Sequence, residues 1–245
     1  MTFATGFQAR MIDGILILDK PAGLSSARAV AGIKRLLPRP TKVGHAGTLD
    51  PFATGVLLIL IGKATRLCES LMNLPKSYQA VLRLGATTET DDPDSPPLVT
   101  PDPRPPSRQQ FVEAADSFIG TIQQRPPAYS ALKIGGRRAY DLARSGQTVE
   151  LAPRAVRVDA IRIDSYEWPT ATLSVDCGRG FYVRALARDL GEKLGVGGYL
   201  TALRRTAIGP YRDQDAMALD QATLDSITAR ILPAAAAGPP RPRNE

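Results

Sequence analysis

Cysteine is scarce in this sequence, which has only Cys68 and Cys177 among its 245 residues. The two lie far apart and form no C-x-x-C pair, so neither a disulfide framework nor a thiolate metal site is predicted. The longest apolar runs, residues 15–18 and 56–61, fall far short of the roughly 20 residues that a membrane-spanning helix needs. The N-terminus lacks the ordered basic, apolar and small-residue regions of a secretory signal. We therefore expect a cytoplasmic protein without a membrane span.

Negative charge is in the minority, because 31 lysines and arginines face 24 acidic residues, which gives a net charge of +7 and a pI near 9.6. A positive surface favours polyanionic partners, since neutralised phosphates release counterions. The same excess can also serve solubility alone. Nucleic acid is therefore the first class of partner to test. With 43% hydrophobic residues, the chain can also fill a core without covalent crosslinks.

Strands and helices are predicted along most of the chain. Apolar periodicity and turn signals predict strands at residues 14–18, 56–61, 78–84, 155–165, 171–177 and 203–208, and helices at 26–37, near 64, and at 108–119, 183–194 and 219–232. Residues 86–106 are rich in proline and acids without an apolar period, which indicates a surface excursion. Residues 121–150 are polar and basic, which favours an insertion that projects from the core.

The densest group of unusual residues is Gly44-His-Ala-Gly-Thr-Leu-Asp50-Pro51, directly before a buried strand. Its two glycines permit close backbone approach to a ligand, and Pro51 stiffens the chain after the Asp50 carboxylate. His45 is the only histidine in the chain. A structural loop with a capping aspartate could use the same residue types, and the spacing leaves both interpretations open.

This segment resembles the catalytic motif of the pseudouridine synthase family that includes the bacterial tRNA pseudouridine-55 synthase. Further motifs resemble that family in the same order from residue 13 to about 210. They are Lys20-Pro21, Lys76-Ser-Tyr78, Pro127-Ala-Tyr-Ser-Ala-Leu-Lys133, Gly180-Phe-Tyr182-Val-Arg184 and Leu203-Arg-Arg. The resemblance implies an α+β fold with a mixed, mainly antiparallel sheet, flanking helices and a cleft for RNA. It also implies conversion of uridine 55 in the T-loop of tRNA to pseudouridine.

The resemblance assigns the chemistry to three residues. Isomerising uridine requires the bond between base and ribose to break and re-form through carbon, without a redox, metal or cofactor step. An ionised carboxylate can serve as the covalent partner, and the resemblance gives that role to Asp50. It places Arg184 beside Asp50 as a counter-charge, and it gives Tyr78 the roles of stacking on the base and relaying a proton. Tyr182 and Leu203 are expected among the residues that contact the substrate.

The remaining expected contacts are with RNA. The target uridine must leave its stack before a carboxylate can reach it, and the resemblance implies that His45 fills the vacated position. Lys20 is expected to support the active-site loop or a phosphate. Lys133, Arg137 and Arg138, around Gly135-Gly136, are expected to contact phosphates in an insertion that closes over the RNA.

For the domain organisation, we expect one catalytic domain at residues 10–232 that contains the 121–150 insertion, followed by a disordered tail at 233–245. The C-terminal PUA module that bacterial family members usually carry is expected to be absent, and the protein is expected to act as a monomer.

Three alternatives stay open at this point. The first is an RNA-binding or RNA-folding protein whose isomerase activity is lost or dispensable, against which the intact set Asp50, Tyr78 and Arg184 argues. The second is the catalytic subunit of a guide-RNA particle, although no long basic tail or extra domain supports it. Generic carboxylate hydrolysis is weaker, because no second acid lies in a comparable motif.

Overall fold

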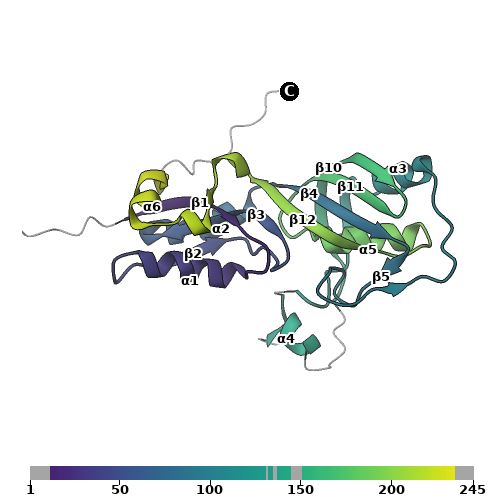
Figure 1. Cartoon of the computed structure of the whole chain (residues 1–245), viewed down its shortest axis with the longest axis horizontal. Coiled ribbons are helices and arrows are strands. Elements are labelled where there is room, and N and C mark those ends of the chain that lie inside the picture. Colours follow the sequence, from purple (N-terminus) through teal and green to yellow (C-terminus); the bar gives the residue numbers. More distant parts are fainter. Residues whose placement is uncertain (1–11, 131, 135–136, 145–150, 235–245) are drawn as a thin grey trace, which may run out of the picture. The chain divides into compact units, whose positions relative to one another are not determined.

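The computed structural model describes residues 12–130, 132–134, 137–144 and 151–234. The chain divides into two compact units, of which the second is Leu74–Ala207 and the first comprises the residues on either side of it (Figure 1). The sequence did not predict this division. Most of the tail predicted at 233–245 lies outside the described residues.

The sheet of the first unit is built around β1 (Gly14–Lys20) and β3 (Thr54–Ile61), which pair antiparallel along their length. β14 (Met217–Ala218) adds a parallel neighbour to β1, and β2 (Val43–Ala46) pairs antiparallel with β3. The strands predicted at 14–18 and 56–61 are confirmed. The first part of the glycine-rich motif, Gly44 to Ala46, therefore lies on a strand.

Helix α1 (Ser26–Leu36) packs Ala29 and Ile33 into the apolar core of this unit. The side chain of Ser25 caps it by accepting from the backbone N–H of Arg28, a role that serine commonly takes at the start of a helix. Leu36 is 39% exposed, because the helix ends there and the extended Leu37 takes the buried place.

The other helical pieces of the first unit are short. The helix predicted near residue 64 begins as a 3-10 segment, and the helix predicted at 219–232 is reduced to α6, because a 3-10 turn and an extended Ala222 precede it. The helical segments are Gly62–Leu67 (3-10), α2 Cys68–Asn73, Asp213–Asp215 (3-10), Leu219–Gln221 (3-10) and α6 Leu224–Arg230. The short strand β13 (Tyr211–Arg212) precedes the second of the 3-10 segments.

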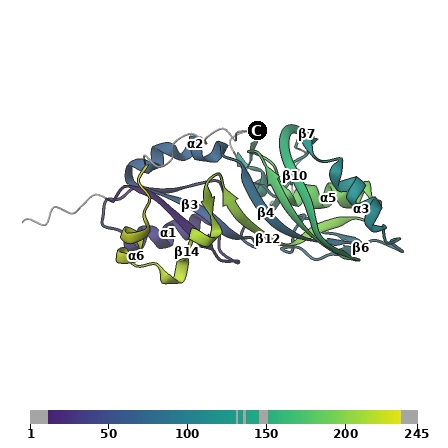
Figure 2. The same cartoon turned by 90° about the horizontal axis from the view of Figure 1, so that it is seen from above.

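The sheet of the second unit has the strand order β12-β4-β11-β10-β7, and β4, β11, β10 and β7 pair antiparallel in succession (Figure 2). The fold class predicted from the sequence, α+β with a mixed and mainly antiparallel sheet, is confirmed. The bounds are β4 Lys76–Leu84, β7 Gly120–Gln124, β10 Arg154–Glu167, β11 Thr170–Cys177 and β12 Gly198–Ile208.

Helices α3 (Arg108–Asp116) and α5 (Val183–Lys193) pack against this sheet and against each other (Figure 2). A reciprocal capping box between Ser107 and Gln110 starts α3. α5 confirms the helix predicted at 183–194. It lies so close to the turn before β12 that a Cβ on Gly191 would come within 2.2 Å of the Gly197 carbonyl carbon, so only glycine fits there.

Two expectations for the second unit were wrong in part. The segment predicted as a surface excursion holds β5 (Ala86–Thr87) and β6 (Leu98–Val99), and between them Asp92 is only 3% exposed. The segment predicted as a projecting insertion begins with β7, which pairs with β10 in the sheet. Further along lie β8 (Lys133–Ile134), β9 (Arg137–Arg138) and α4 (Ala139–Arg144).

Candidate active site

The residue before the expected nucleophile is fixed by the start of α1. The Oγ of Ser26 accepts from the backbone N–H of Leu49 at 2.9 Å and donates to the Leu49 carbonyl at 3.0 Å. Leu49 is 4% exposed, while Asp50 is half-buried and its carbonyl accepts from the N–H of Ala53. The buried Ser26 hydroxyl thus satisfies both backbone groups of Leu49, the residue before Asp50.

Lys20 braces the same loop from β1. Its side chain is fully buried, and its Nζ donates to the carbonyls of Pro21 at 2.7 Å, Leu24 at 2.7 Å and Pro51 at 3.2 Å. The ammonium thus joins the loop after β1 to the residue that follows Asp50. Of the two roles expected for Lys20, this geometry favours support of the loop over contact with a phosphate.

His45 lies on β2 opposite Ile59 and is half-buried. Its carbonyl accepts from the thiol of Cys68 at 3.5 Å, which connects β2 with α2. Gly47 follows with a φ of 86°, a left-handed conformation that favours glycine. His45 therefore lies on a strand that ends just before the Asp50 loop in the sequence. Its role in filling the vacated base position stays a prediction.

Two of the expected site residues lie on strands of the second unit. Tyr78 is half-buried on β4 opposite Val175, and Leu203 is 7% exposed on β12. Two residues before Tyr78, Lys76 is 8% exposed, and its Nζ donates to the Leu74 carbonyl at 2.6 Å. Burial, together with the nearby charge of Arg205, lowers the pKa of Lys76 to about 8.

Tyr182, directly before α5, is held from two sides. The side-chain amide of Gln124 donates to the Tyr182 carbonyl at 3.1 Å and accepts from its N–H at 2.9 Å. The guanidinium carbon of Arg154 lies 5.3 Å from the centre of the tyrosine ring, and its Nη2 donates to the Gly180 carbonyl at 2.6 Å. Gln124 and Arg154 face each other across β7 and β10. The sequence did not single out either residue.

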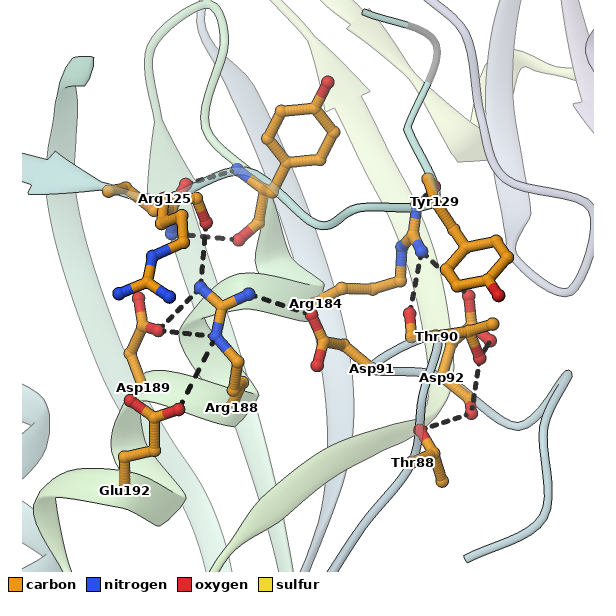
Figure 3. Close-up of polar contacts among 12 residues, drawn as sticks. Thr88, Thr90, Asp91, Asp92, Arg125, Tyr129, Arg184, Arg188, Asp189 and Glu192 are labelled. Carbon is orange, nitrogen blue, oxygen red and sulfur yellow. Dashed lines mark hydrogen bonds and ion pairs between the residues drawn. The ribbon is translucent and has the colours of Figure 1, made fainter. Parts of the chain in front are cut away.

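Arg184, in the first turn of α5, is 3% exposed and holds two chain segments at once (Figure 3). Its Nη1 lies 2.9 Å from the carbonyl of Thr90 and 3.1 Å from Oδ2 of Asp92. Its Nη2 donates to the carbonyl of Tyr129 at 2.9 Å. Asp92 is therefore a buried partner of Arg184 that sequence reasoning missed. The one signal for it was the hydroxyl residues around it, Thr88 and Thr90, which suit a buried carboxylate.

Both the carboxylate and the backbone carbonyl of Asp92 accept bonds from its own loop as well. Thr90 Oγ1 donates to Oδ1, the backbone N–H of Asp94 donates to the same oxygen at 3.0 Å, and Thr88 Oγ1 donates to the Asp92 carbonyl at 2.9 Å. Burial raises the pKa of Asp92, and the Thr90 hydroxyl and the Arg184 charge oppose that rise. The loop is therefore built around a carboxylate that it partly stabilises in charged form.

The predicted site residues are thus distributed over both units. Lys20, His45 and Asp50 belong to the first, and Tyr78, Tyr182, Arg184 and Leu203 belong to the second. The expected pairing of Arg184 with Asp50 stays a prediction, since the partner established for Arg184 within its own unit is Asp92. The side chains of Lys133, Arg137 and Arg138 lie outside what the structure describes.

Within the described ranges, no three acidic, histidine or cysteine side chains form a group suited to a metal ion. Across those same residues, no helix has the length and apolar character needed to span a membrane.

Comparison with known proteins agrees with the motifs and the fold. Residues 34–183 match the family model "TruB family pseudouridylate synthase (N terminal domain)", and residues 184–231 match "tRNA pseudouridylate synthase B C-terminal domain". The chain therefore belongs to the TruB family of pseudouridine synthases. The family and the enzyme class predicted from the sequence are confirmed.

Two bacterial relatives are similar to this chain over most of its length. The chain is 47% identical over 223 residues to the tRNA pseudouridine synthase B of Xanthomonas campestris pv. campestris (strain B100), covering 91% of this chain and 70% of that protein. It is 46% identical over 228 residues to the protein of the same name from Burkholderia mallei (strain NCTC 10247), covering 91% and 74%.

Solved structures share the fold. The structure is similar to a chain in the crystal structure of a Cbf5-Nop10-Gar1 complex, with a TM-score of 0.69 and 28% identity over 91% of this chain. It is also similar to a chain in an H/ACA RNP bound to a substrate RNA containing 2'-deoxyuridine, with a TM-score of 0.67 and 27% identity. This chain spans about 60% of the length of each.

Proposed function

We propose that this protein converts uridine 55 in the T-loop of tRNA to pseudouridine, as a stand-alone cytoplasmic enzyme that acts as a monomer without a cofactor. The observation that carries the proposal is the Asp50 loop, which Ser26 and Lys20 brace from buried positions. It occurs in a chain whose relatives at 46–47% identity are named tRNA pseudouridine synthase B.

In this proposal, Asp50 supplies the covalent step. Its carboxylate attacks the substrate while the bond between the uracil nitrogen and the ribose breaks. The base then rotates and rejoins the ribose through a ring carbon, that carbon loses its proton while the freed ring nitrogen gains one, and the carboxylate is released. Atoms and electrons balance within the uridine, so no oxidant or reductant takes part. A nucleophile on a rigid loop is effective because little reorganisation is needed to bring it into line.

The second unit supplies the surroundings of the base. Tyr78 stacks on the uracil and relays a proton, while Tyr182 and Leu203 form walls of the pocket. Gln124 and Arg154 support this assignment for Tyr182, because their contacts fix both its backbone and its ring. Arg184 serves as the counter-charge of Asp50. The contacts of Arg184 with Asp92 and with two carbonyls favour that role, since they hold the guanidinium in one orientation.

The RNA is held by groups on both units. His45 takes the place of the extruded uridine, which compensates for part of the lost stacking. Lys133, Arg137 and Arg138 contact phosphates. The backbones of these three residues belong to the paired strands β8 and β9, and lysine and arginine side chains are common donors to phosphate oxygens.

A second candidate function is that of an RNA-guided catalytic subunit, which the similarity to the Cbf5 chain of a complex with Nop10 and Gar1 supports. The identity of 28% to that chain is well below the 46–47% to the proteins named tRNA pseudouridine synthase B. The stand-alone enzyme is therefore the stronger proposal. A guided subunit would need added RNA and partner proteins for turnover.

The test is to incubate the purified protein with an unmodified tRNA transcript and to map pseudouridine by chemical labelling and primer extension. A matched transcript with cytidine at position 55 serves as the control. We expect one site of modification, at position 55, without added RNA or protein. Modification at another position, or only in the presence of a guide RNA, would contradict the proposal.

A further inference from the structure

Helix α5 carries a second arginine one turn after Arg184, and it is bonded in the same manner (Figure 3). The Nη1 of Arg188 lies 3.0 Å from Oδ2 of Asp91, and its Nη2 donates to the carbonyl of Arg125 at 2.8 Å. Its side chain is 18% exposed and that of Asp91 is 13% exposed. The two arginines therefore pair with two adjacent aspartates.

Both arginines bridge the same two segments of chain. One segment is the loop around Asp91 and Asp92, and the other leads from Arg125 to Tyr129. A further bond joins these segments directly, because the Tyr129 hydroxyl donates to the carboxylate of Glu89. The second segment lies near the start of the basic insertion. Helix α5 therefore contacts this part of the insertion at two points, through Arg188 to the Arg125 carbonyl and through Arg184 to the Tyr129 carbonyl.

Residues of α5 itself also hold the Arg188 guanidinium, in addition to its bonds with the two segments. Its Nε and Nη2 lie 2.9 Å and 2.7 Å from Oδ1 of Asp189, and Glu192 lies one turn further along at 4.0 Å. The Asp91 side is fixed by its backbone, because its carbonyl accepts from the N–H of Leu200 at 3.1 Å and its φ is 58°. Such pre-orientation lowers the entropy lost when each bond forms.

We propose that Arg188 and Asp91 are a positioning pair for the pseudouridine synthase reaction: they anchor the Asp92 loop and the base of the basic insertion to α5 and so set the orientation of Arg184. This inference rests on the proposed function and extends it to two residues outside the family motifs described above. Arg188 acts on the reaction through Arg184 and has no contact with the substrate in this scheme.

The ion pair between Arg188 and Asp91 should also depend on pH. Burial raises the pKa of Asp91 to about 6, against the opposing charges of Arg188 and Arg184, while the neighbouring Asp189 adds to the rise. Asp91 is therefore mostly ionised at pH 8 and mostly protonated at pH 5, so the ion pair is lost as the pH falls through about 6. The anchoring should weaken over the same range.

The anchoring is tested without any substrate by hydrogen–deuterium exchange of the free protein. We expect Arg188→Gln to increase exchange in peptides that cover residues 88–95 and 125–130, and Arg188→Lys to give a smaller increase, because a lysine keeps the charge but not the several donors. The matched control is Arg157→Gln, since Arg157 is also ion-paired in the second unit but is 74% exposed. Unchanged exchange in Arg188→Gln would overturn the proposal, whether or not the protein is active.

The effect on the reaction is tested by comparing single-turnover rates of the wild type and Asp91→Asn from pH 5 to pH 8.5. Asparagine keeps the shape of the side chain and tolerates a positive φ. We expect a rate about tenfold lower at pH 8, equivalent to about 1.4 kcal/mol, with the ratio to the wild type approaching one below pH 6. Asp102→Asn is the control, because Asp102 is exposed and also has a positive φ, 44°.

A ratio of one at pH 8, or a ratio that does not change with pH, would refute the positioning role. Failure of the wild type to form pseudouridine would instead refute the proposed function, and the exchange measurement would still show whether Arg188 anchors the two segments.

Discussion

Arg184 and Asp92 form an ion pair of 3.1 Å in which the two side chains are only 4% and 5% exposed. Removing two charges from water costs more than their attraction usually returns, so a buried ion pair is weak evidence for stability. The bonds from Arg184 to the carbonyls of Thr90 and Tyr129 use further N–H groups of the guanidinium. We infer that the pair fixes the direction in which the guanidinium faces.

This inference predicts that stability and activity can be separated. Asp92→Asn should lower the free energy of unfolding by about 3 kcal/mol, because it leaves a buried charge without its ion partner. The double variant Arg184→Met/Asp92→Leu removes both charges and should recover most of that loss, while its single-turnover rate stays at least about a hundredfold below the wild type. Urea unfolding and pseudouridine formation are measured on the same preparations. A double variant that regains activity would contradict the role assigned to Arg184.

A second prediction concerns the pH dependence of stability, through Lys76. Its pKa in the folded protein is lowered to about 8 from the usual 10.5, so between these values the unfolded chain binds more protons. The stability of the wild type should therefore rise as pH increases from 8 to 10.5. The variant Lys76→Met has no titrating group at this position. The difference in the free energy of unfolding between this variant and the wild type should therefore be greatest at and below pH 8.

The measurement for Lys76 is the free energy of unfolding of both proteins at pH 7 and at pH 10.5. The advantage of Lys76→Met should shrink between them by an amount on the order of 3 kcal/mol, at about 1.4 kcal/mol per pKa unit. Lys193→Met, at an exposed position on the end of α5, should show a difference that is independent of pH. A constant difference for Lys76→Met as well would mean that the lysine keeps its ordinary pKa.

The strands and the main helix of the second unit were predictable because their signals are local. The alternation in residues 78–84 and the apolar period of 183–194 each reflect one buried face, and both elements formed where expected. β7 was missed because Gly120–Gln124 is polar, with a single buried residue, Gln124. Its pairing with β10, thirty or more residues further on, gives it an edge position that no local pattern reveals.

The same limit applies to the site. Asp50 could be singled out because the unusual residues around it, Gly44 to Pro51, form one local motif, and the resemblance to the family named it as the expected nucleophile. Asp92 could not, because its partner Arg184 lies 92 residues away in the sequence. An acidic, proline-rich segment is expected to be exposed to solvent when no cation is known to pair with it. Here the cation is Arg184, and only the fold brings α5 next to the Asp92 loop.

A third prediction concerns the basic insertion. Replacing Lys133, Arg137 and Arg138 with alanine should weaken tRNA binding and reduce the slope of log affinity against log salt by about 2, because each phosphate contact on an RNA strand contributes roughly 0.7. The control removes the same charge elsewhere in the second unit, by replacing the exposed Arg104, Arg108 and Lys193. An equal change in both variants would show that only net charge matters and that the insertion has no direct contact with phosphates.

The last prediction concerns the nucleophile. Asp50→Asn keeps the shape of the side chain but removes its charge and nucleophilicity, so it should abolish pseudouridine formation. The bonds that hold its loop involve Ser26, Lys20 and backbone groups, so the loop should keep its conformation. Affinity for tRNA should therefore remain within about tenfold of the wild type, or roughly 1.4 kcal/mol, because binding depends on phosphates and RNA shape. Binding and product formation should be measured on one preparation of each protein. Substantial turnover by Asp50→Asn would exclude a covalent role for this carboxylate, while a loss of binding together with activity would indicate that the substitution disturbs the loop itself.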